Sequence, residues 1–532
     1  GNNCGANGAV QTAIFCDPQL GCSNRLVAED LAEEHSWQFS QELRLSSDFQ
    51  GPFNFSVGGN YMHYVTDENY YVFINTLTMY AAVQGIAGRG GVPYVPGVDH
   101  NQRCLSNGRE LAMPQSATNP EECLGYIDPN PIGQLDNQGH NYFLSQNPYS
   151  LNSYAMFGET YYQLTKDLKL TAGLRWTDDQ KHFVEIPSEV LTKGYGYPST
   201  GNIDQEWKEF TGRAVVNWTP HLNFTDQTMI YGSYAHGYKA GGANPPGAVL
   251  LVFGEGDTGN PTHPTTFAPE FNDAFELGTK NTLFDGAVTL NGDVFYYDYK
   301  GYQISQIVDR TAVNLNFNAT VKGAELEASY EPLPGLKFSF AGGYEDTHLA
   351  KGSKAIDLMD RTAGQPGWMV VKPIFVATSN CILPDYLVAE LVGAGLVTNN
   401  AALGSGSAYI NSLQFAACQT AYTKHLDPTS VVPGTLPPSG FDPTDPAIIQ
   451  ETNNGEGFDK DLSGNQLPNA PPFTVSFSAD YTLPITPDWA GTLRGDYYWQ
   501  DYSWARVFND NPYDRLRGYT NVNLALILTS QT

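Results

Sequence analysis

The stretch FNDAFELGTKNTLFDGAVTLNGDVFYYDYK at residues 271–300, followed by NATVKGAELEAS at 318–329, decides the fold. Apolar and polar residues alternate within it, as where Val294 follows Asp293. A period of two is typical of a β-strand with one apolar and one polar side. The stretch contains two such alternating segments, and only the short turn 283–286 separates them. The stretch therefore predicts an antiparallel hairpin.

Three tyrosines, Tyr296, Tyr297 and Tyr299, gather toward the end of the second strand of this hairpin. Aromatic side chains collect at the membrane–water interface of β-barrels, where an amphipathic ring lies at the level of the lipid headgroups. The cluster therefore favours a membrane barrel over a soluble sandwich.

The composition limits the classes of protein that the chain can represent. Its 532 residues carry a net charge of −28, so clustered cations for binding nucleic acid are not expected. Aromatic residues make up 13%, and 53 Gly and 34 Pro indicate many turns. The sequence contains no apolar run of about 18 residues, so no transmembrane helix is expected. It does not open with the charged and then apolar segment of a signal peptide.

Alternation recurs along the rest of the chain and predicts about thirteen strands. Short and long connections between these strands alternate along the whole chain without exception. The short ones are 48–52, 165–167, 219–226, 283–286, 331–335 and 483–489, and the long ones are 65–152, 182–206, 240–270, 300–316, 348–470 and 503–516. Short turns at one rim and long loops at the other are typical of an outer-membrane β-barrel.

Several of these segments resemble the barrel of TonB-dependent outer-membrane receptors. The similarity is carried, in order, by FSQELRLSS (39–47), LTAGLRWTDDQK (170–181), TMIYGSYAHGYKAGG (228–242), LNGDVFYYDYKGYQ (290–303), VKGAELEASY (321–330) and LPNAPP (467–472). The resemblance implies an all-β, transmembrane antiparallel barrel in the bacterial outer membrane. It also implies 22 strands in the intact protein, an N-terminal plug domain and a contact with the TonB complex.

On this basis we expect four regions. Residues 1–34 form an extracellular loop, 35–347 and 471–532 form barrel hairpins, and 348–470 form a large extracellular lobe with some helix. An odd number of strands leaves a barrel wall open. We therefore expect the plug, the TonB-contacting segment and the last strands to lie in sequence outside this chain.

The seven cysteines lie in loop-like stretches and form no CxxC pair, which favours disulfides in an oxidising compartment over a metal site. Cys104–Cys123 and Cys381–Cys418 are the natural local pairs. The pairing among Cys4, Cys16 and Cys22 stays open, and one of these three is left over.

The polar sides of the predicted strands carry charges that we expect to face the lumen of the barrel. They are Glu42, Arg44, Arg175, Arg213, Glu276, Lys280, Asp293, Glu325, Glu327, Arg494 and Asp496. A role in relaying substrate or protons is one interpretation. A hydrated wall whose charges pair across strands and contact a plug is the other.

Four residues at the end of one strand, Tyr234, His236, Tyr238 and Lys239, are candidates for stacking on a ligand, although anchoring at the membrane interface explains them equally well. The ten histidines form no HxH or HExxH group, so no metal or other cofactor is expected. No motif of a nucleophilic or P-loop enzyme is present either.

The resemblance implies a receptor that catalyses no reaction and takes up a scarce, bulky nutrient such as a siderophore, cobalamin or an oligosaccharide. Its expected partners are outer-membrane lipid, the TonB complex, its own plug domain and the small-molecule or oligosaccharide substrate. Two alternatives stay open: a passive porin-like or structural surface barrel, and a secreted or outer-membrane enzyme acting on glycans.

Overall fold

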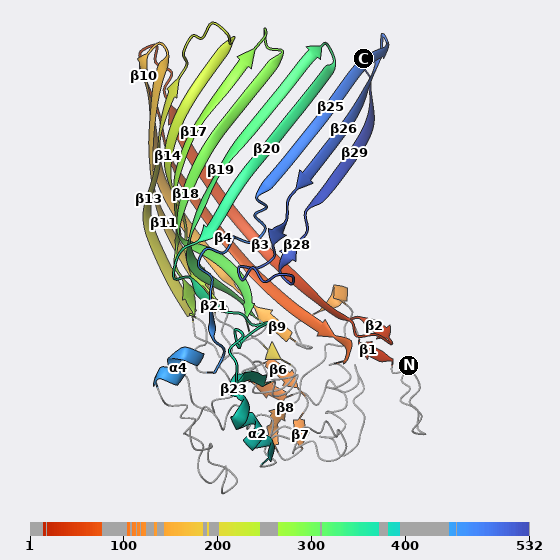
Figure 1. Ribbon diagram of the computed structural model, residues 1–532. Coiled ribbons are helices and arrows are strands. Elements are labelled where there is room, and N and C mark those ends of the chain that lie inside the picture. Colours follow the sequence, from red (N-terminus) through yellow and green to blue (C-terminus); the bar gives the residue numbers. More distant parts are fainter. Residues whose placement is uncertain are drawn as a thin grey trace.

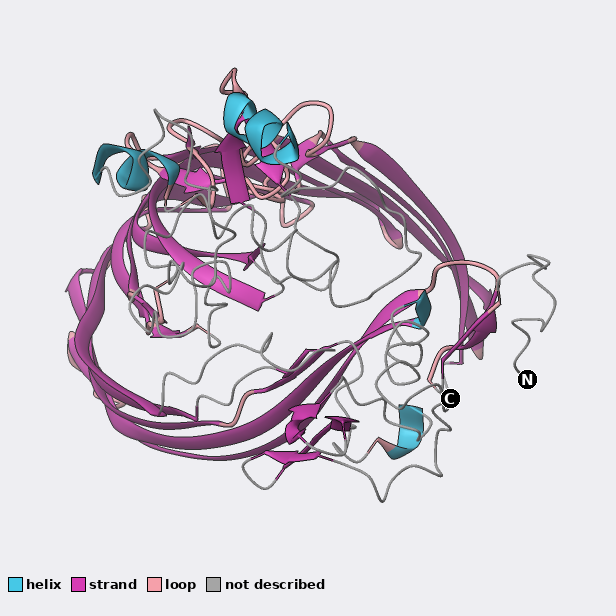
Figure 2. Cartoon of the chain, turned by 90° about the horizontal axis from the view of Figure 1, so that it is seen from below, coloured by secondary structure: helices cyan, strands magenta, loops and turns pink. Residues whose placement is uncertain are grey.

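A computed structural model describes residues 14–17, 19–76, 104–106, 109–112, 114–116, 119–123, 132–135, 143–184, 189–190, 202–244, 264–308, 311–371, 381–393, 446–453 and 455–530. One large antiparallel sheet dominates this part of the chain and curves into a wall (Figures 1 and 2). The sheet has fifteen strands, of which β9 (Phe143–Gln146) and β12 (Glu189–Val190) are short pieces. The other thirteen confirm the predicted all-β fold and its strand count.

The long strands lie side by side in the order of the chain, each antiparallel to the next. They are β3 (Ala28–Ser46), β4 (Phe53–Ile74), β10 (Tyr149–Thr165), β11 (Leu168–Val184), β13 (Asn202–Trp218), β14 (Gln227–Lys239), β17 (Glu270–Leu283), β18 (Val288–Val308), β19 (Thr311–Leu333), β20 (Leu336–Leu349), β25 (Phe473–Thr486), β26 (Trp489–Gln500) and β29 (Tyr519–Ser530). Within the described residues, β3 and β29 are the two edges of the wall.

Tight turns join these strands at one rim, and the small elements cluster at the other (Figure 1). In the turn between β17 and β18, Phe284, Asp285 and Gly286 all have positive φ, at 58°, 55° and 85°. Left-handed backbone of this kind lets two strands reverse within a few residues. We call the rim with the tight turns the turn rim and the opposite one the loop rim.

The loop rim carries short strands, one short 3-10 helix and two short α-helices. They are β1 (Phe15–Asp17), β2 (Gly21–Ser23), β5 (Cys104–Ser106), β6 (Arg109–Ala112), β7 (Pro114–Ser116), β8 (Asn119–Cys123), η2 (Ile132–Gln134), β15 (Gly242–Ala243), β16 (Thr266–Phe267), β21 (Lys354–Ile356), β22 (Trp368–Val371), β23 (Cys381–Pro384), α2 (Asp385–Gly393), α4 (Pro446–Thr452), β24 (Asp459–Asp461), β27 (Ser503–Trp504) and β28 (Arg515–Leu516). None of the described helices is long and apolar enough to span a bilayer.

The strands reach further toward the loop rim than the sequence predicted. The expected long loop 300–316 is wrong, because β18 runs to Val308 and β19 begins at Thr311, with a register shift between Tyr299 and Tyr302. Strand β3 begins at Ala28, inside the expected loop 1–34, and β4 continues to Ile74, inside the expected loop 65–152. In the extensions of β3 and β4, consecutive acidic residues such as Glu33–Glu34 and Asp67–Glu68 fall on both sides of the strand and interrupt the alternation of apolar and polar residues.

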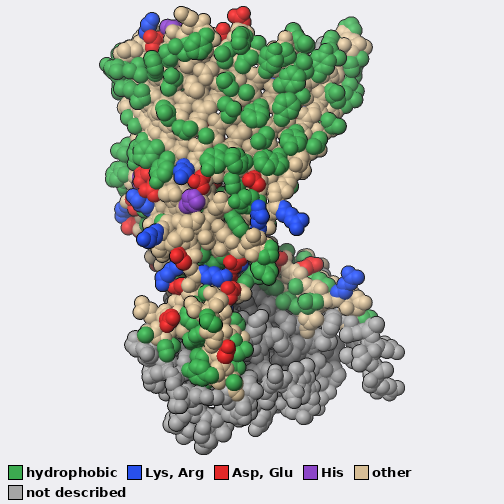
Figure 3. Space-filling model, viewed as in Figure 1, with side chains coloured by type: hydrophobic (Ala, Val, Ile, Leu, Met, Phe, Trp, Pro, Cys, Tyr) green, Lys and Arg blue, Asp and Glu red, His purple; other side chains and the backbone are tan. Residues whose placement is uncertain are grey.

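Two faces of the wall differ in chemistry. The outer face is the one that carries exposed apolar side chains, and Figure 3 shows them as a broad band over the strands. This band includes Leu43 and Leu45 of β3, Leu174 of β11, Phe210 of β13, Phe275 and Leu277 of β17, Leu290 and Val294 of β18, Leu493 of β26 and Leu524 of β29. Successive side chains of a strand point to opposite faces, so the residues between these belong to the inner face.

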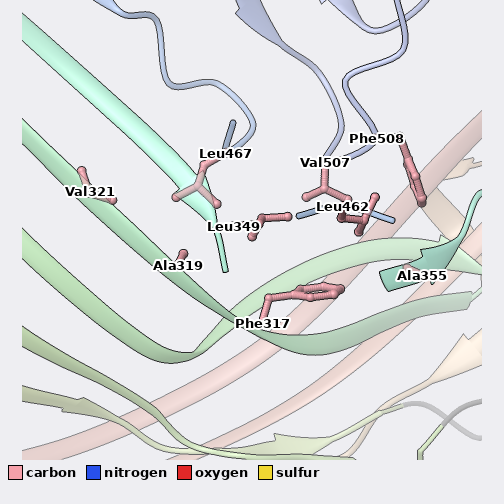
Figure 4. Close-up of a cluster of buried hydrophobic side chains, with 9 residues drawn as sticks. All are labelled: Phe317, Ala319, Val321, Leu349, Ala355, Leu462, Leu467, Val507 and Phe508. Carbon is pink, nitrogen blue, oxygen red and sulfur yellow. The ribbon is translucent and has the colours of Figure 1, made fainter. Parts of the chain in front are cut away.

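A hydrophobic cluster joins β19 and β20 to segments of the loop rim (Figure 4). It consists of Phe317, Ala319, Val321, Leu349, Ala355, Leu462, Leu467, Val507 and Phe508. These residues come from two strands and from the connections after β20, before β25 and after β26. The loop rim is thus packed onto the wall by a core of its own at this place.

Candidate functional site

The inner face of the wall carries the charged residues that the sequence placed there. Ten of the eleven predicted residues have an exposed apolar neighbour on the outer face: Glu42, Arg44, Arg175, Arg213, Glu276, Asp293, Glu325, Glu327, Arg494 and Asp496. Lys280 lies between Thr279 and Asn281 and has the alternation of Glu276 on the same strand. A curved sheet with an apolar outside and a charged inside is the arrangement of a barrel that encloses water.

Basic residues of the inner face pair with acids on their own strand, on an adjacent strand or, as for Arg213 of β13 and Glu159 of β10, across the intervening strand β11. Arg213 donates from Nε and Nη2 to the two carboxylate oxygens of Glu159, at 2.8 and 3.0 Å. A two-pronged contact of this kind fixes both side chains. Arg44 contacts Glu42 at 2.9 Å, and its guanidinium lies 5.5 Å from the centroid of the Phe157 ring.

At the other end of the sheet, Arg494 shares its guanidinium between two carboxylates. It contacts Asp496 at 2.9 Å and Asp480 at 3.7 Å. These three residues lie on β25 and β26 and are partly exposed. Charges thus pair both on β10 and β13, through Arg213, and on β25 and β26, through Arg494. That these charges face a lumen and contact a plug stays a prediction.

An acidic zone lies between these two ends, on β17, β18 and β19. Asp293 lies directly opposite Glu325, and Glu327 lies opposite Asn291. Like charges directly opposite each other destabilise a sheet. Glu276 accepts a hydrogen bond from the hydroxyl of Tyr231. The inner face thus changes from paired charges to excess negative charge along its circumference.

A hollow of about 730 Å³ adjoins the Arg213–Glu159 pair. Its lining also includes Arg175, Lys181 and Tyr238. Lys181 donates to the carbonyl oxygen of Gly241 at 2.6 Å and lies 5.4 Å from the centroid of the Trp207 ring. Cations, an aromatic ring and a carboxylate thus meet at one place on β10, β11, β13 and β14.

A second hollow, of about 690 Å³, lies at the loop rim beside the extension of β18. Tyr302, Gln306, Asn469 and Phe508 are among its lining residues, which are mainly neutral. It adjoins the hydrophobic cluster at Val507 and Phe508. Amide groups and aromatic rings side by side can hold an organic molecule that has both polar and apolar parts.

An ion-pair network fixes one wall of this second hollow. Asp357 is fully buried and accepts hydrogen bonds from Arg506 Nη1 at 2.7 Å and from Lys460 Nζ at 3.1 Å. Arg506 also donates to Asp514 Oδ1 at 2.7 Å, and Lys460 to Asp510 Oδ2 at 3.0 Å. The network joins the segment after β20 to the segment between β26 and β29.

The pKa values in this network shift in the directions that favour the charged forms. Burial by itself raises the pKa of Asp357, but the bonds from Arg506, the Met359 amide and Lys460 outweigh it and lower the pKa to about 2. Burial likewise opposes the charge of Lys460, yet its bonds to Asp510, Asp360 and Asp357 raise the pKa of its ammonium group. Both groups therefore stay ionised at neutral pH.

The four predicted ligand-binding residues lie together on β14, but not on one face. Tyr234 and His236 are opposite Phe275 and Asp273 of β17, which places them on the outer face. The Tyr234 hydroxyl donates to Asp273 Oδ1 at 2.8 Å, and His236 Nδ1 is 2.8 Å from the same oxygen. Side chains alternate along β14, so Tyr238 belongs to the same face as Tyr234 and His236, and Lys239 belongs to the opposite face. Ligand binding by this group stays a prediction.

Sequence reasoning missed the Asp357 network and the loop-rim hollow. Asp357 and Lys460 lie far apart in the connection between β20 and β25, Arg506 lies in the connection between β26 and β29, and no spacing in the sequence relates them. The charge of each residue and the aromatic Phe508 beside Arg506 were visible, but neither feature indicates a contact 149 residues away.

The predicted disulfide pairs stay predictions. Cys22 and Cys381 each take part in a disulfide bond. Cys418 and the side chains of Cys104 and Cys123 lie outside the described residues, as does Cys4. In the described part of the chain, no three His, Cys, Asp or Glu side chains gather as a metal site.

Comparison with known structures finds the same fold. The chain is similar to the ferric yersiniabactin uptake receptor FyuA from Yersinia pestis, with 14% identity, a TM-score of 0.51, and 95% of this chain and 48% of that one covered. The copper transporter OprC gives 11% identity, a TM-score of 0.48, and 93% and 49% coverage. BauA, the ferric preacinetobactin receptor from Acinetobacter baumannii, gives 11% identity and a TM-score of 0.44, with 95% of this chain and 49% of that one covered. The chain thus spans about half the length of these structures.

The family described as TonB dependent receptor-like, β-barrel, matches residues 24–380, which is more than half of the chain. Its members are receptors and transporters of the outer membrane, and the apolar band and charged inner face described above fit that location. The matched region ends shortly before β23, so it includes ten of the thirteen long strands. The chain therefore belongs to the TonB-dependent receptor family and forms wall strands of an outer-membrane β-barrel.

Proposed function

We propose that the protein takes up a scarce, bulky nutrient across the bacterial outer membrane, with energy from the TonB complex, and catalyses no reaction. The substrates considered are a siderophore, cobalamin, an oligosaccharide or a molecule of similar size. The observation that carries the proposal is the loop-rim hollow of about 690 Å³, which opens beside a charged inner wall. A plug domain inside the wall and a TonB contact complete the proposal.

The position of this hollow supports the order of events. Side chains at the loop rim are the first that a molecule from outside meets, and the hollow is large enough for a compact organic ligand. Its mainly neutral lining with Tyr302, Gln306 and Asn469 suits hydrogen bonding together with stacking. The packed cluster and the Asp357 network hold the lining in place before a ligand arrives, which lowers the entropy cost of binding.

Uptake by whole cells tests the proposal. Cells that carry the gene or lack it are supplied with radiolabelled ferric siderophores, cobalamin and oligosaccharides, in strains with and without the TonB complex. We expect uptake of one class that requires both the gene and TonB. Uptake that persists without TonB would indicate a passive barrel, and hydrolysis of a supplied glycan would indicate an enzyme.

Variants at the hollow connect the uptake to the structure. Changing Tyr302 and Gln306 to Ala removes a ring and an amide from the lining, and we expect uptake at limiting substrate to fall roughly tenfold. Lys166→Ala is the matched control, because Lys166 lies at the turn rim with a side chain that is 79% exposed. Equal uptake by both variants would remove the hollow from the proposal.

A further inference from the structure

Beyond the apolar band, the outer face of β14, β17, β18, β19 and β20 carries two similar charged clusters. In the first, Asp273 contacts Lys300 Nζ at 3.8 Å and His236 Nδ1 at 2.8 Å. In the second, Asp346 contacts Lys322 Nζ at 3.2 Å and His348 Nε2 at 2.7 Å. We call these six residues the outer-face patch. Each half consists of one carboxylate, one lysine and one histidine.

Strand register places both halves on the outer face. Asp273 has the parity of Phe275 and Leu277 on β17, which are 49% and 58% exposed. Lys322 lies opposite Tyr296, and Asp346 lies opposite Lys322. Tyr296 is itself 43% exposed and belongs to the apolar face of β18. The patch therefore points away from the lumen and toward the surroundings of the wall.

A row of aromatic rings lies next to the patch on the side of the turn rim. It consists of Tyr234, Phe275, Tyr296, Tyr344 and Phe473, which are opposite or near one another on adjacent strands. Such a girdle marks the boundary between hydrocarbon and headgroups. The patch is one step further toward the loop rim, so it lies at the depth of the headgroups. Figure 3 shows charged side chains gathering below the apolar band.

The cations of the patch are its exposed part. The side chains of Lys300 and Lys322 are 62% and 56% exposed, whereas those of Asp273 and Asp346 are 23% and 21% exposed. The carboxylates thus lie behind and hold the ammonium and imidazole groups, which face outward. An approaching headgroup meets hydrogen-bond donors first.

We propose that the outer-face patch binds the phosphate groups of lipid in the leaflet at the loop rim. Lysine ammonium groups are phosphate ligands, and each has two donors left when one is directed to its carboxylate. Near an anionic membrane surface, each lysine strengthens the attraction. Asp298 lies opposite Asp273 on the same face and is half-buried, so it opposes the anion, and the two exposed lysines on either side of it carry the binding.

The patch has a chemical consequence for the wall. The two halves sit on neighbouring hairpins, and a lipid with two phosphates on one headgroup can contact both. Bound lipid would then fix the depth at which the strands β14 to β20 sit in the membrane. This role is separate from uptake, because none of the six patch residues lines the loop-rim hollow.

Binding of defined lipids to the whole receptor in detergent tests the proposal. The probes are diphosphoryl lipid A, the same lipid with both phosphates removed, and inorganic phosphate as a competitor, with retention measured by native mass spectrometry. We expect diphosphoryl lipid A to bind the receptor, and the double variant Lys300→Gln, Lys322→Gln to bind it roughly tenfold more weakly. The variant Lys300→Arg, Lys322→Arg keeps the charge and should retain the lipid.

The matched control is the double variant Lys166→Gln, Lys337→Gln, which removes the same charge from exposed residues at the turn rim. It should bind the lipid as the unchanged receptor does. Equal binding by the Lys300, Lys322 glutamine variant would overturn the proposal. The proposal would also be overturned if the lipid without phosphates were retained as well as diphosphoryl lipid A. Displacement of the lipid by inorganic phosphate would likewise contradict it, because the patch would then bind phosphate and not select a lipid.

Discussion

Asp357 shows what one buried carboxylate does at the loop rim. Its side chain is fully buried and holds Arg506 and Lys460, which are themselves 28% and 18% exposed. Removing one partner of a buried ion pair leaves the other charge uncompensated, and this costs more than the pair contributes. The contact also spans two separate connections, so its loss affects both.

Asp357→Asn should therefore loosen the loop rim. Because the two cations retain some contact with water, we expect a local loss of about 3 kcal/mol. Hydrogen exchange is the measurement, with faster exchange in both 351–371 and 505–514. Asp461→Asn is the control, since Asp461 is exposed and bonds only within its own turn. Unchanged exchange in either segment of the Asp357 variant would contradict the assigned role of the network.

The same carboxylate predicts a dependence on pH. Burial alone raises the pKa of Asp357, but hydrogen bonds from Arg506, the Met359 amide and Lys460 lower it to about 2, below the value of about 4 in an unfolded chain. A lowered pKa in the folded state means that the stabilisation is complete above about pH 4 and is lost as the pH falls to about 2. Limited proteolysis of the loop rim across this window should show the change. The Asp357→Asn variant should be cleaved at the same rate throughout this pH window. If the cleavage rates of both proteins changed with pH in the same way, Asp357 would not be the group responsible.

At the scale of a strand, the two faces of β18 predict opposite responses to the same substitution. Val294 is 53% exposed on the apolar outer face, so Val294→Arg places a guanidinium in lipid at a cost of about 2–4 kcal/mol. Asn291 points inward, with Glu327 opposite it on β19 and Lys280 opposite it on β17. Asn291→Arg should therefore fold nearly as the unchanged protein does.

The folded fraction in outer-membrane preparations measures this difference, because folded and unfolded barrels migrate differently on unheated gels. We expect a clear loss for Val294→Arg and little change for Asn291→Arg. Equal losses would mean that the two faces of β18 do not meet lipid and water as assigned.

At the scale of the whole molecule, the unequal rims predict the orientation in the membrane. Short turns belong to the periplasmic side and long connections to the outside. A cysteine in place of Lys351 at the loop rim should react with a membrane-impermeant maleimide on intact cells, above the background of the parent protein. A cysteine in place of Lys166 at the turn rim should react only after the cells are broken. The reverse pattern would mean that the turn rim, and not the loop rim, faces the outside of the cell.

Much of this wall was predictable because period-two alternation depends only on neighbouring residues. Leu277 and Glu276, or Leu493 and Arg494, are assigned to opposite faces by their order alone, and the structure follows that order. The tight turns were predictable for the same reason. Where both sides of a strand are polar, as from Glu29 to Glu34 in β3, the signal disappears and the sequence reads as a loop although the backbone is paired.

The sequence by itself determined the all-β fold and the number of long strands, because both follow from local order, and the resemblance of its hairpin motifs indicated the family. Only the tertiary structure decided which charges meet. It brought Asp357 to Arg506 and Lys460, and it put His236 on the outer face beside Asp273. These contacts depend on how separate strands and connections approach one another in space, and that distance is not encoded in the spacing of any one segment.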